Sequence, residues 1–419
     1  MWKAITVNTI YQIIGKGFGV TASIIVIALI TRSLGAGGFG DYVLATTVPA
    51  FFYLFVDFGL NAIFLRNIVQ GKDHRGQFGS LLGLRLGLAG LFFSLGALYI
   101  FLSPYPQLVK VGSFLGLFTV FTQGIFTSLN ALFQHNLRYD LSILAGIFSS
   151  LLGVLLTIFG FLRGAGLLFF VGVWVLDAFV LAILAFLFSQ KLPEKPSLSL
   201  NRVWLRRLFW ASFPLGLMLI FAQINAKADI FLLSLLDTPK SLGIYGLADK
   251  VFDNALFIPT FFVNALYPVL LKDRKRSLTL LWSRLRKGVL LLLGVSLPLA
   301  VLGFVFSPLI VLILGGKGFE SSILVSQLLV LTLPLFFVTA PLQWFLIVVG
   351  KERILPVIYG VAALVNITIN ILFIPRFSYL ASVFATIFSE LIILLLIIFA
   401  VRRFKSRMGK MLANSPARN

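Results

Sequence analysis

Residues 210–268 read WASFPLGLMLIFAQINAKADIFLLSLLDTPKSLGIYGLADKVFDNALFIPTFFVNALYP, and the fold class can be predicted from this segment. It contains two apolar helices joined by a polar turn at 237–242, and each helix is long enough to cross a hydrocarbon core of ~30 Å. Charged side chains are costly inside lipid, so they normally face the interior of a helix bundle or a water-filled cavity. The polar residues within the two helices are Gln223, Asn225, Lys227, Asp229, Asp249, Lys250 and Asp253.

Helical spacing divides the polar residues of the first helix between two faces. Asn225 and Asp229 are four positions apart and share one face. Gln223 and Lys227 share the nearly opposite face. Because the helix cannot turn both faces toward lipid, we predict that it lines a cavity.

The same stretch contains one copy of an internal repeat. Gly243-Ile-Tyr-Gly-Leu-Ala248 matches Gly40-Asp-Tyr-Val-Leu-Ala45, which lies 203 residues earlier in a chain of 419. Each copy follows a long apolar helix and a short turn, and each opens the next helix. The shared context at half the chain length predicts two related halves, as many transporters have.

The composition is typical of a membrane protein. The chain is 59% hydrophobic and 12% charged, with a mean hydropathy of +1.03. Its net charge of +21 is spread between apolar runs and not gathered on a polar surface, which argues against a nucleic-acid partner. The absence of cysteine excludes disulfides and thiolate metal sites, and the two histidines, His74 and His135, lie in predicted loops. The first apolar run, 8–31, is too long for the core of a cleavable signal peptide.

Apolar runs of about 20 residues predict an all-α polytopic membrane protein with about twelve transmembrane helices, six in each half. Short turns such as 163–166 join several runs and place neighbouring helices antiparallel. The predicted spans are 8–31, 41–65, 78–102, 111–133, 141–162, 167–188, 209–235, 243–271, 288–313, 323–348, 356–374 and 379–400.

The distribution of basic residues predicts the topology. If the N-terminus is inside, the inside segments hold 25 of the 35 Lys and Arg residues and the outside segments hold six. This asymmetry predicts that both termini are cytoplasmic. The longest connection is basic and contains Pro193 and Pro196, and the basic tail can contact anionic membrane lipid. The predicted domains are an N-terminal bundle at 1–188, a cytoplasmic linker at 189–208, a C-terminal bundle at 209–400 and a cytoplasmic tail at 401–419.

Oxygen-bearing side chains on three predicted helices lie at similar depth near the outer end of the C-terminal half. Hard cations such as Na⁺ are bound by carboxylate, amide, hydroxyl and carbonyl oxygens, so the set predicts a site for a coupling ion. Hydrogen bonding between helices is the alternative. The residues are Asp229 on the seventh span, Asn366 and Asn370 on the eleventh, and Ser382, Thr386 and the deeper Glu390 on the twelfth.

Two further groups are candidates for substrate binding. Lys16, Asp57 and Arg85 each lie seven or eight residues from the cytoplasmic end of a span, which predicts a net-positive cluster inside the inner mouth. Snorkelling toward the membrane surface is the alternative for the two basic residues. The eighth span carries the second group, in which one aspartate is expected to pair with a lysine. The complete candidate set is Lys16, Asp57, Arg85, Lys227, Asp249, Lys250 and Asp253.

The sequence contains no motif of a known catalytic class. It lacks a G-x-S-x-G nucleophile turn, an H-E-x-x-H zinc motif and a P-loop, and no loop is long enough for a catalytic domain. We therefore predict that the protein is not an enzyme and needs no cofactor.

An ordered set of short motifs resembles the bacterial polysaccharide flippases, which transport O-antigen and exopolysaccharide repeat units and belong to the multidrug/oligosaccharidyl-lipid/polysaccharide exporter superfamily. The resemblance covers nearly the whole chain. The first half carries it in Leu34-Gly35, Gly38-Phe39-Gly40-Asp41-Tyr42, Asp57-Phe58-Gly59-Leu60 and Arg66, and the second half in Phe213-Pro214-Leu215, Asp229, Gly243, Tyr245, Ile258-Pro259, Asn366, Asn370 and Ile374-Pro375.

The resemblance implies two six-helix bundles around a central cavity in the bacterial inner membrane. The implied substrate is an undecaprenyl-diphosphate-linked oligosaccharide, moved to the outer leaflet by alternating access, with a glycan polymerase as an expected partner. The related lipid II flippases use basic cavity residues that Lys16 and Lys250 resemble. They also bind sodium through residues that Asp229, Asn366, Asn370 and Thr386 resemble, with the carbonyl of Ser382 as a further ligand. Asn370 stands where those relatives have Asp, and Na⁺ or H⁺ is the expected coupling ion.

Two alternatives remain open from the sequence. A multidrug exporter or antiporter of the same superfamily would expel small organic cations and would favour an acidic cavity, whereas this chain places four basic residues beside its acids. A membrane enzyme that polymerises or ligates lipid-linked glycans would carry a large outside loop, and the outside loops here are short.

Overall fold

The computed structural model describes residues 2–61, 63–64, 74–136, 138–193, 195–196 and 198–413. The basic residues Arg66 and Lys72 of the first inside loop, and the end of the tail at 414–419, lie outside these ranges. The helices are α1 (Trp2–Asp57), α3 (His74–Leu102), α4 (Gln107–Leu117), α5 (Thr119–His135), α6 (Tyr139–Leu162), α7 (Leu167–Ser189), α8 (Arg202–Leu236), α9 (Pro239–Ala255), α10 (Phe257–Arg276), α11 (Leu278–Leu314), α12 (Ser321–Val330), α13 (Leu333–Val348), the short 3₁₀ helix η1 (Glu352–Ile354), α14 (Leu355–Phe377) and α15 (Tyr379–Ala413).

The described residues contain eleven helical stretches that are long and apolar enough to cross a membrane. Each corresponds to one predicted span except α1, which holds the first two. The break within α1 is at Gly35, whose backbone angles (φ 65°, ψ −178°) are accessible to glycine and strained for other residues. The prediction of an all-α fold with about twelve spans is therefore confirmed.

Three predicted spans are each divided into two consecutive helices: α4 and α5, α9 and α10, and α12 and α13. Proline accounts for two of the divisions, because it lacks the N–H that a continuous helix needs. Pro259 lies in the first turn of α10, and Pro334 lies in the first turn of α13. Pro214, in contrast, lies within the continuous helix α8.

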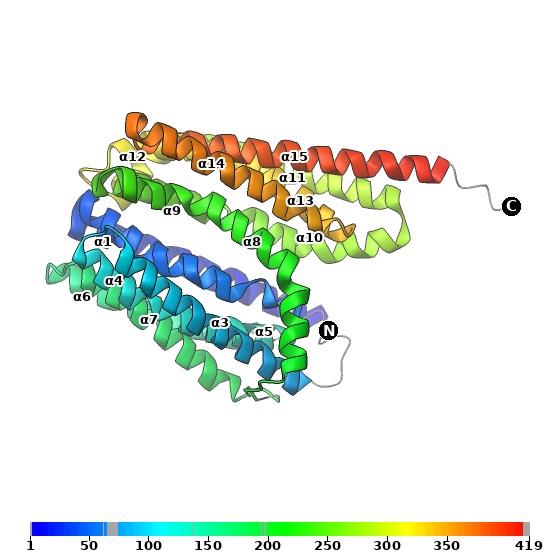
Figure 1. Ribbon diagram of the computed structural model, residues 1–419, viewed down its shortest axis with the longest axis horizontal. Helices are drawn as coiled ribbons and strands as arrows, with labels where there is room; N and C mark the ends of the chain where they lie inside the picture. Colours follow the sequence, from blue (N-terminus) through cyan, green and yellow to red (C-terminus); the bar gives the residue numbers. More distant parts are fainter. Residues whose placement is uncertain are drawn as a thin grey trace.

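Figure 1 shows the helices in two groups. Helices α1 and α3–α7 form the lower group, and α9–α15 form the upper one. Helix α8 begins beside the lower group and runs into the upper group, where it packs against α14. The start of α1 and the end of α15 lie toward the same end of the molecule. We call the two groups the N-terminal and C-terminal lobes.

The two copies of the sequence repeat meet where α1 crosses α9. A Cβ atom added to Gly40 would lie 1.9 Å from the carbonyl oxygen of Pro239, and one added to Gly243 would lie 1.9 Å from the carbonyl oxygen of Ala36. Only glycine allows two helix backbones to approach so closely. Nearby, the Arg32 guanidinium donates to the carbonyl oxygen of Ile313 at 2.7 Å, so α11 also joins this contact between the lobes.

The outer surface of both lobes is apolar. Large side chains are exposed along α3, α6, α11, α14 and α15, including Leu98, Leu155, Val305, Leu364 and Leu395. A soluble protein rarely exposes a continuous apolar surface of this kind, whereas lipid solvates it.

The predicted linker at 189–208 is only partly a loop. Helix α7 ends at Ser189 and α8 begins at Arg202, so the last seven residues of the predicted linker are helical. The Asn201 side chain caps α8 by accepting hydrogen bonds from the backbone N–H groups of Val203 (3.0 Å) and Trp204 (3.3 Å). The hydropathy pattern did not predict residues 202–208 as part of the helix, because this segment is rich in arginine and precedes the apolar run.

Candidate functional site

Lys227 of α8 is neutralised by two carboxylates of α9. Its Nζ lies 2.8 Å from Asp249 Oδ2 and 2.8 Å from Asp253 Oδ2. The two aspartates are four positions apart on one helical face, as their spacing predicts. The charge of Lys227 is therefore neutralised by side chains of the protein. All three residues belong to the substrate-binding set predicted from the sequence.

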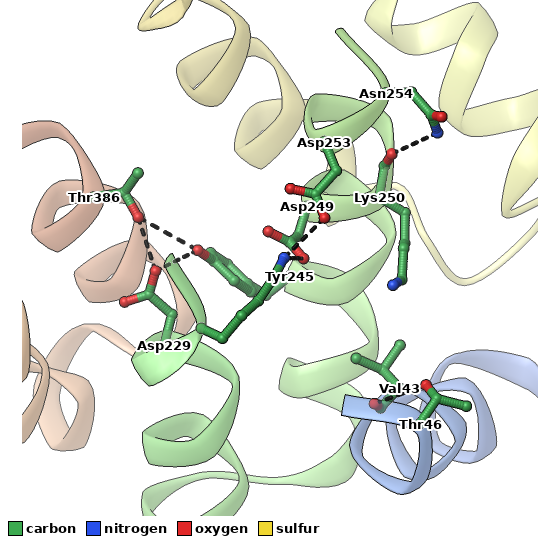
Figure 2. Close-up of polar contacts among 10 residues, drawn as sticks. Val43, Thr46, Asp229, Tyr245, Asp249, Lys250, Asp253, Asn254 and Thr386 are labelled. Atoms are coloured by element: carbon green, nitrogen blue, oxygen red, sulfur yellow. Dashed lines mark hydrogen bonds and ion pairs between the residues drawn. The ribbon is translucent and has the colours of Figure 1, made fainter. Parts of the chain in front are cut away.

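Lys250 of α9 has a different environment. Figure 2 shows its amine pointing away from Asp249 and Asp253 and toward the segment of α1 that carries Val43 and Thr46. It forms no ion pair with any residue that the structure describes. Because α9 turns about 100° per residue, adjacent positions 249 and 250 face different sides of the helix.

A cavity of about 440 Å³ lies between the lobes, and Lys250 lines it. Its wall comes from α1, α6 and α7 of the N-terminal lobe, and from α8 and α9. Gln223 and Lys227 also line it, as predicted from the two-faced pattern of α8. The remaining polar lining includes Ser23, Tyr42, Thr46, Thr47, Ser150, Thr157 and Asp177. Sequence reasoning missed Asp177, although a lone acid within the sixth span was a signal for it.

The predicted basic cluster at the inner mouth forms only in part. Arg85 is fully buried, and its Nη2 lies 2.7 Å from Asp57 Oδ1. Its Nη1 donates to Asn61 Oδ1 (3.0 Å) and Ser128 Oγ (2.9 Å). These contacts tie α1, α3 and α5 together. The guanidinium is fully buried, and its Nε has no hydrogen-bond partner among the described residues. Lys16 lies apart from these contacts.

Lys16 contacts the C-terminal lobe. Its Nζ lies 2.8 Å from the centroid of the Phe257 ring at the start of α10, which is a cation–π contact between the lobes. An aromatic ring leaves the hydrogen-bonding capacity of an ammonium group largely unused, so this lysine retains donors for an anion.

The predicted cation ligands do converge around Asp229, which is buried at 1% exposure. Its Oδ1 accepts a hydrogen bond from Asn370 Nδ2 at 2.6 Å. Its Oδ2 accepts from the Tyr245 hydroxyl at 2.7 Å and from Thr386 Oγ1 at 2.8 Å. Figure 2 shows the last two contacts. The carboxylate is thus surrounded by donors from α9, α14 and α15.

A second layer of contacts holds the amides of α14. Asn370 Nδ2 also donates to Asn366 Oδ1 at 3.0 Å, and Ser382 Oγ donates to Asn370 Oδ1 at 2.7 Å. Sequence reasoning missed Tyr245, which is the tyrosine of the repeated motif. In this conformation each oxygen of Asp229 accepts at least one hydrogen bond from the protein, and Asn370 presents its N–H group, not its oxygen, to the carboxylate.

A family model described as polysaccharide biosynthesis protein matches residues 29–324, which is most of the chain and includes both copies of the repeat. The chain belongs to this polysaccharide biosynthesis family. A search of curated proteins finds no match.

Solved structures show that this member of the polysaccharide biosynthesis family has a transporter fold. Lipid II flippase MurJ, in an inward closed conformation, aligns with a TM-score of 0.71 and 13% identity over 95% of this chain and 87% of that one. An inward-facing multidrug resistance MATE transporter aligns with a TM-score of 0.68 and 14% identity over 93% of this chain and 95% of that one. A MOP superfamily transporter from Pyrococcus furiosus aligns with a TM-score of 0.56 and 13% identity over 96% of both chains.

Proposed function

We propose that the protein is a flippase that moves an undecaprenyl-diphosphate-linked oligosaccharide from the cytoplasmic to the outer leaflet of a bacterial inner membrane. The family match and the transporter fold support a membrane transporter in polysaccharide biosynthesis. A lysine without an ion pair supports the diphosphate, in a cavity that also carries the carboxylate of Asp177. Among the candidate basic residues, Lys250 is the one that lines the cavity and has no ion-pair partner among the described residues.

In the proposed mechanism the diphosphate binds between the lobes. Lys250 contacts it from the C-terminal lobe, and Lys16 leaves the Phe257 ring to contact it from the N-terminal lobe. An ammonium group binds phosphate oxygens as a compact point charge, and outside bulk water this interaction is strong. The lipid tail stays in the bilayer while the lobes rock about the glycine contact between α1 and α9.

The coupling step is also part of the proposal. A monovalent cation, Na⁺ in the first instance, binds at Asp229 together with Asn366, Asn370, Ser382 and Thr386. Binding there draws α8, α14 and α15 together, and this biases the equilibrium between conformations. A cation can shift that equilibrium only by its difference in affinity for the two states.

The proposal is tested by glycan export in a bacterium whose own copy of the gene is deleted. Lys16→Ala and Lys250→Ala should each reduce surface glycan at unchanged protein abundance, and Lys250→Arg should restore part of it. Lys240→Ala is the matched control, because Lys240 is exposed at the start of α9, outside the cavity lining. Normal export by the Lys16→Ala/Lys250→Ala double variant would contradict the proposal.

A further inference from the structure

A second cavity, of about 390 Å³, lies within the C-terminal lobe. Helices α8, α9, α13, α14 and α15 supply most of its wall. The polar residues that line it are Gln223, Asn225, Tyr245, Asp249, Asp253, Thr260, Thr339, Gln343, Tyr359, Thr386 and Glu390. No lysine, arginine or histidine is among the described residues that line it.

Three buried oxygen atoms of this lining have no hydrogen-bond partner in the described part of the chain. They are Oε1 of Glu390 on α15, Oδ1 of Asn225 on α8 and Oγ1 of Thr339 on α13. The three residues are 3%, 8% and 3% exposed. A buried acceptor without a partner costs free energy, and the cost is larger for a carboxylate than for an amide.

Three hydroxyl groups of the lining are committed to other acceptors. The Tyr359 hydroxyl donates to Gln343 Oε1 at 2.6 Å, and the Tyr245 hydroxyl donates to Asp229 at 2.7 Å. Thr386 donates to Asp229 as well. These three hydroxyls are thus unavailable to Glu390. The Thr339 hydroxyl can donate to one oxygen of the carboxylate, and Oε1 of Glu390 has no partner among the described residues.

Charge balance shows that the lining is net negative. Asp249 and Asp253 share the single charge of Lys227, and Glu390 has no ion-pair partner among the described residues. Two negative charges therefore remain uncompensated, and a cation bound at Glu390 would offset one of them. The volume is that of about a dozen liquid water molecules, so the ion can keep part of its hydration shell.

We propose that this cavity is a second cation site, in which Na⁺ binds to the Glu390 carboxylate and the Asn225 amide oxygen, directly or through water. The site is separate from the one proposed at Asp229, but it is adjacent to it. Thr386 lines this cavity and also donates to Asp229. One side chain therefore contacts both sites, and occupation of one site should alter the affinity of the other.

The test is equilibrium binding of radioactive ²²Na⁺ to the purified full-length protein, at constant ionic strength maintained with N-methylglucamine chloride. Glu390→Gln keeps the size and hydrogen-bonding capacity of the side chain and removes its charge. We expect it to bind one ion fewer than the wild type. Asn225→Leu is the second variant, and it should weaken binding at this site at least tenfold with every carboxylate in place.

Glu320→Gln is the matched control. Glu320 is exposed before α12, and backbone N–H groups, including that of Gly318, lower the pKa of its carboxyl, so the variant also removes a negative charge. It should bind as the wild type does. Wild-type stoichiometry and affinity in Glu390→Gln would overturn the inference, and so would the same result in Asn225→Leu if Glu390→Gln does not fold.

Asp229→Asn distinguishes this inference from the proposed coupling site. If Asp229→Asn loses one ion and Glu390→Gln loses none, the second site is refuted and the first stands. If Glu390→Gln loses one ion and Asp229→Asn loses none, the second site stands and the first is refuted. If the wild type binds two ions, each variant binds one and the double variant binds none, both sites stand. If the wild type binds one ion and each variant loses it, the two groups form one site and the separate second site is refuted.

Discussion

At the scale of single residues, two lysines of neighbouring helices have different environments. Lys227 is held by Asp249 and Asp253, whereas Lys250 lines the cavity between the lobes. Helical spacing predicted the faces of α8 correctly and predicted an ion pair with an aspartate. It could not say which lysine would pair, because that depends on how α8 crosses α9.

Exchange of each lysine for methionine should separate the two roles. Lys227→Met leaves Asp249 and Asp253 near each other without a counter-charge. The substitution should lower the free energy of unfolding by up to about 3 kcal/mol. This is the lower end of the range for breaking a buried ion pair, and we expect it because the side chain of Asp253 is 41% exposed. Lys250→Met should change it by less than about 0.5 kcal/mol. Thermal unfolding in detergent measures both, and equal melting temperatures would contradict the assignment.

The amide at position 370 determines how Asp229 is satisfied. Asn370→Asp replaces a donor to Asp229 with a second carboxylate, so the variant should be less stable than the wild type without Na⁺. Na⁺ should restore it, by about 2.7 kcal/mol at a hundredfold excess over Kd. The measurement is the melting temperature with and without Na⁺ at fixed ionic strength. Asn254→Asp on α9 makes the same chemical change away from the site, and a Na⁺ effect no larger than in that control would refute the prediction.

At the scale of helices, the sequence repeat predicted two related halves, but it gave no sign that the two copies touch. The contact depends on the relative placement of the lobes, which a short motif cannot encode. The apolar pattern continues across the divisions at Phe118, Leu256 and Leu331, so each predicted span runs through its division. Pro259 and Pro334 lie inside predicted spans, where a missing N–H permits a kink, and they mark two of these breaks in the sequence.

The glycine contact between α1 and α9 is close enough that a single added methyl group should lower the stability of the protein. Gly243→Ala places a Cβ against the backbone of Ala36, so the helices must separate and the melting temperature should fall. Gly37→Ala is the control, because a Cβ there meets no atom within 4 Å and alanine favours the helix by roughly 0.5–1 kcal/mol. If Gly243→Ala is as stable as Gly37→Ala, the close approach of the backbones is wrong.

At the scale of the whole molecule, composition and hydropathy were sufficient to predict the membrane fold and its number of spans. They could not determine the site, because side chains from α8, α9, α14 and α15 come together only through tertiary packing. Arg85 illustrates the limit. Its depth in the span suggested a cavity residue, and packing instead placed it in a buried pair with Asp57.

The charge asymmetry predicts the orientation of the molecule. Cysteines introduced at Lys191 and Lys240, both exposed, report on opposite membrane sides in this cysteine-free chain. In intact cells an impermeant maleimide should label position 240 and not position 191, and disruption of the membrane should expose both. Labelling of position 191 in intact cells would reverse the topology.

The central claim is that the protein carries a lipid-linked diphosphate across the bilayer and that Lys250 contacts it. The most direct measurement is leaflet exchange of a fluorescent undecaprenyl-diphosphate oligosaccharide in vesicles that contain the purified protein, read by quenching with a membrane-impermeant reductant. The wild type and Lys240→Ala should accelerate exchange over protein-free vesicles. Lys250→Ala should be slower by at least about tenfold, because a charge-assisted hydrogen bond contributes ~1.5–3 kcal/mol. Exchange no faster than in protein-free vesicles, or equal rates for Lys250→Ala and the wild type, would contradict the claim.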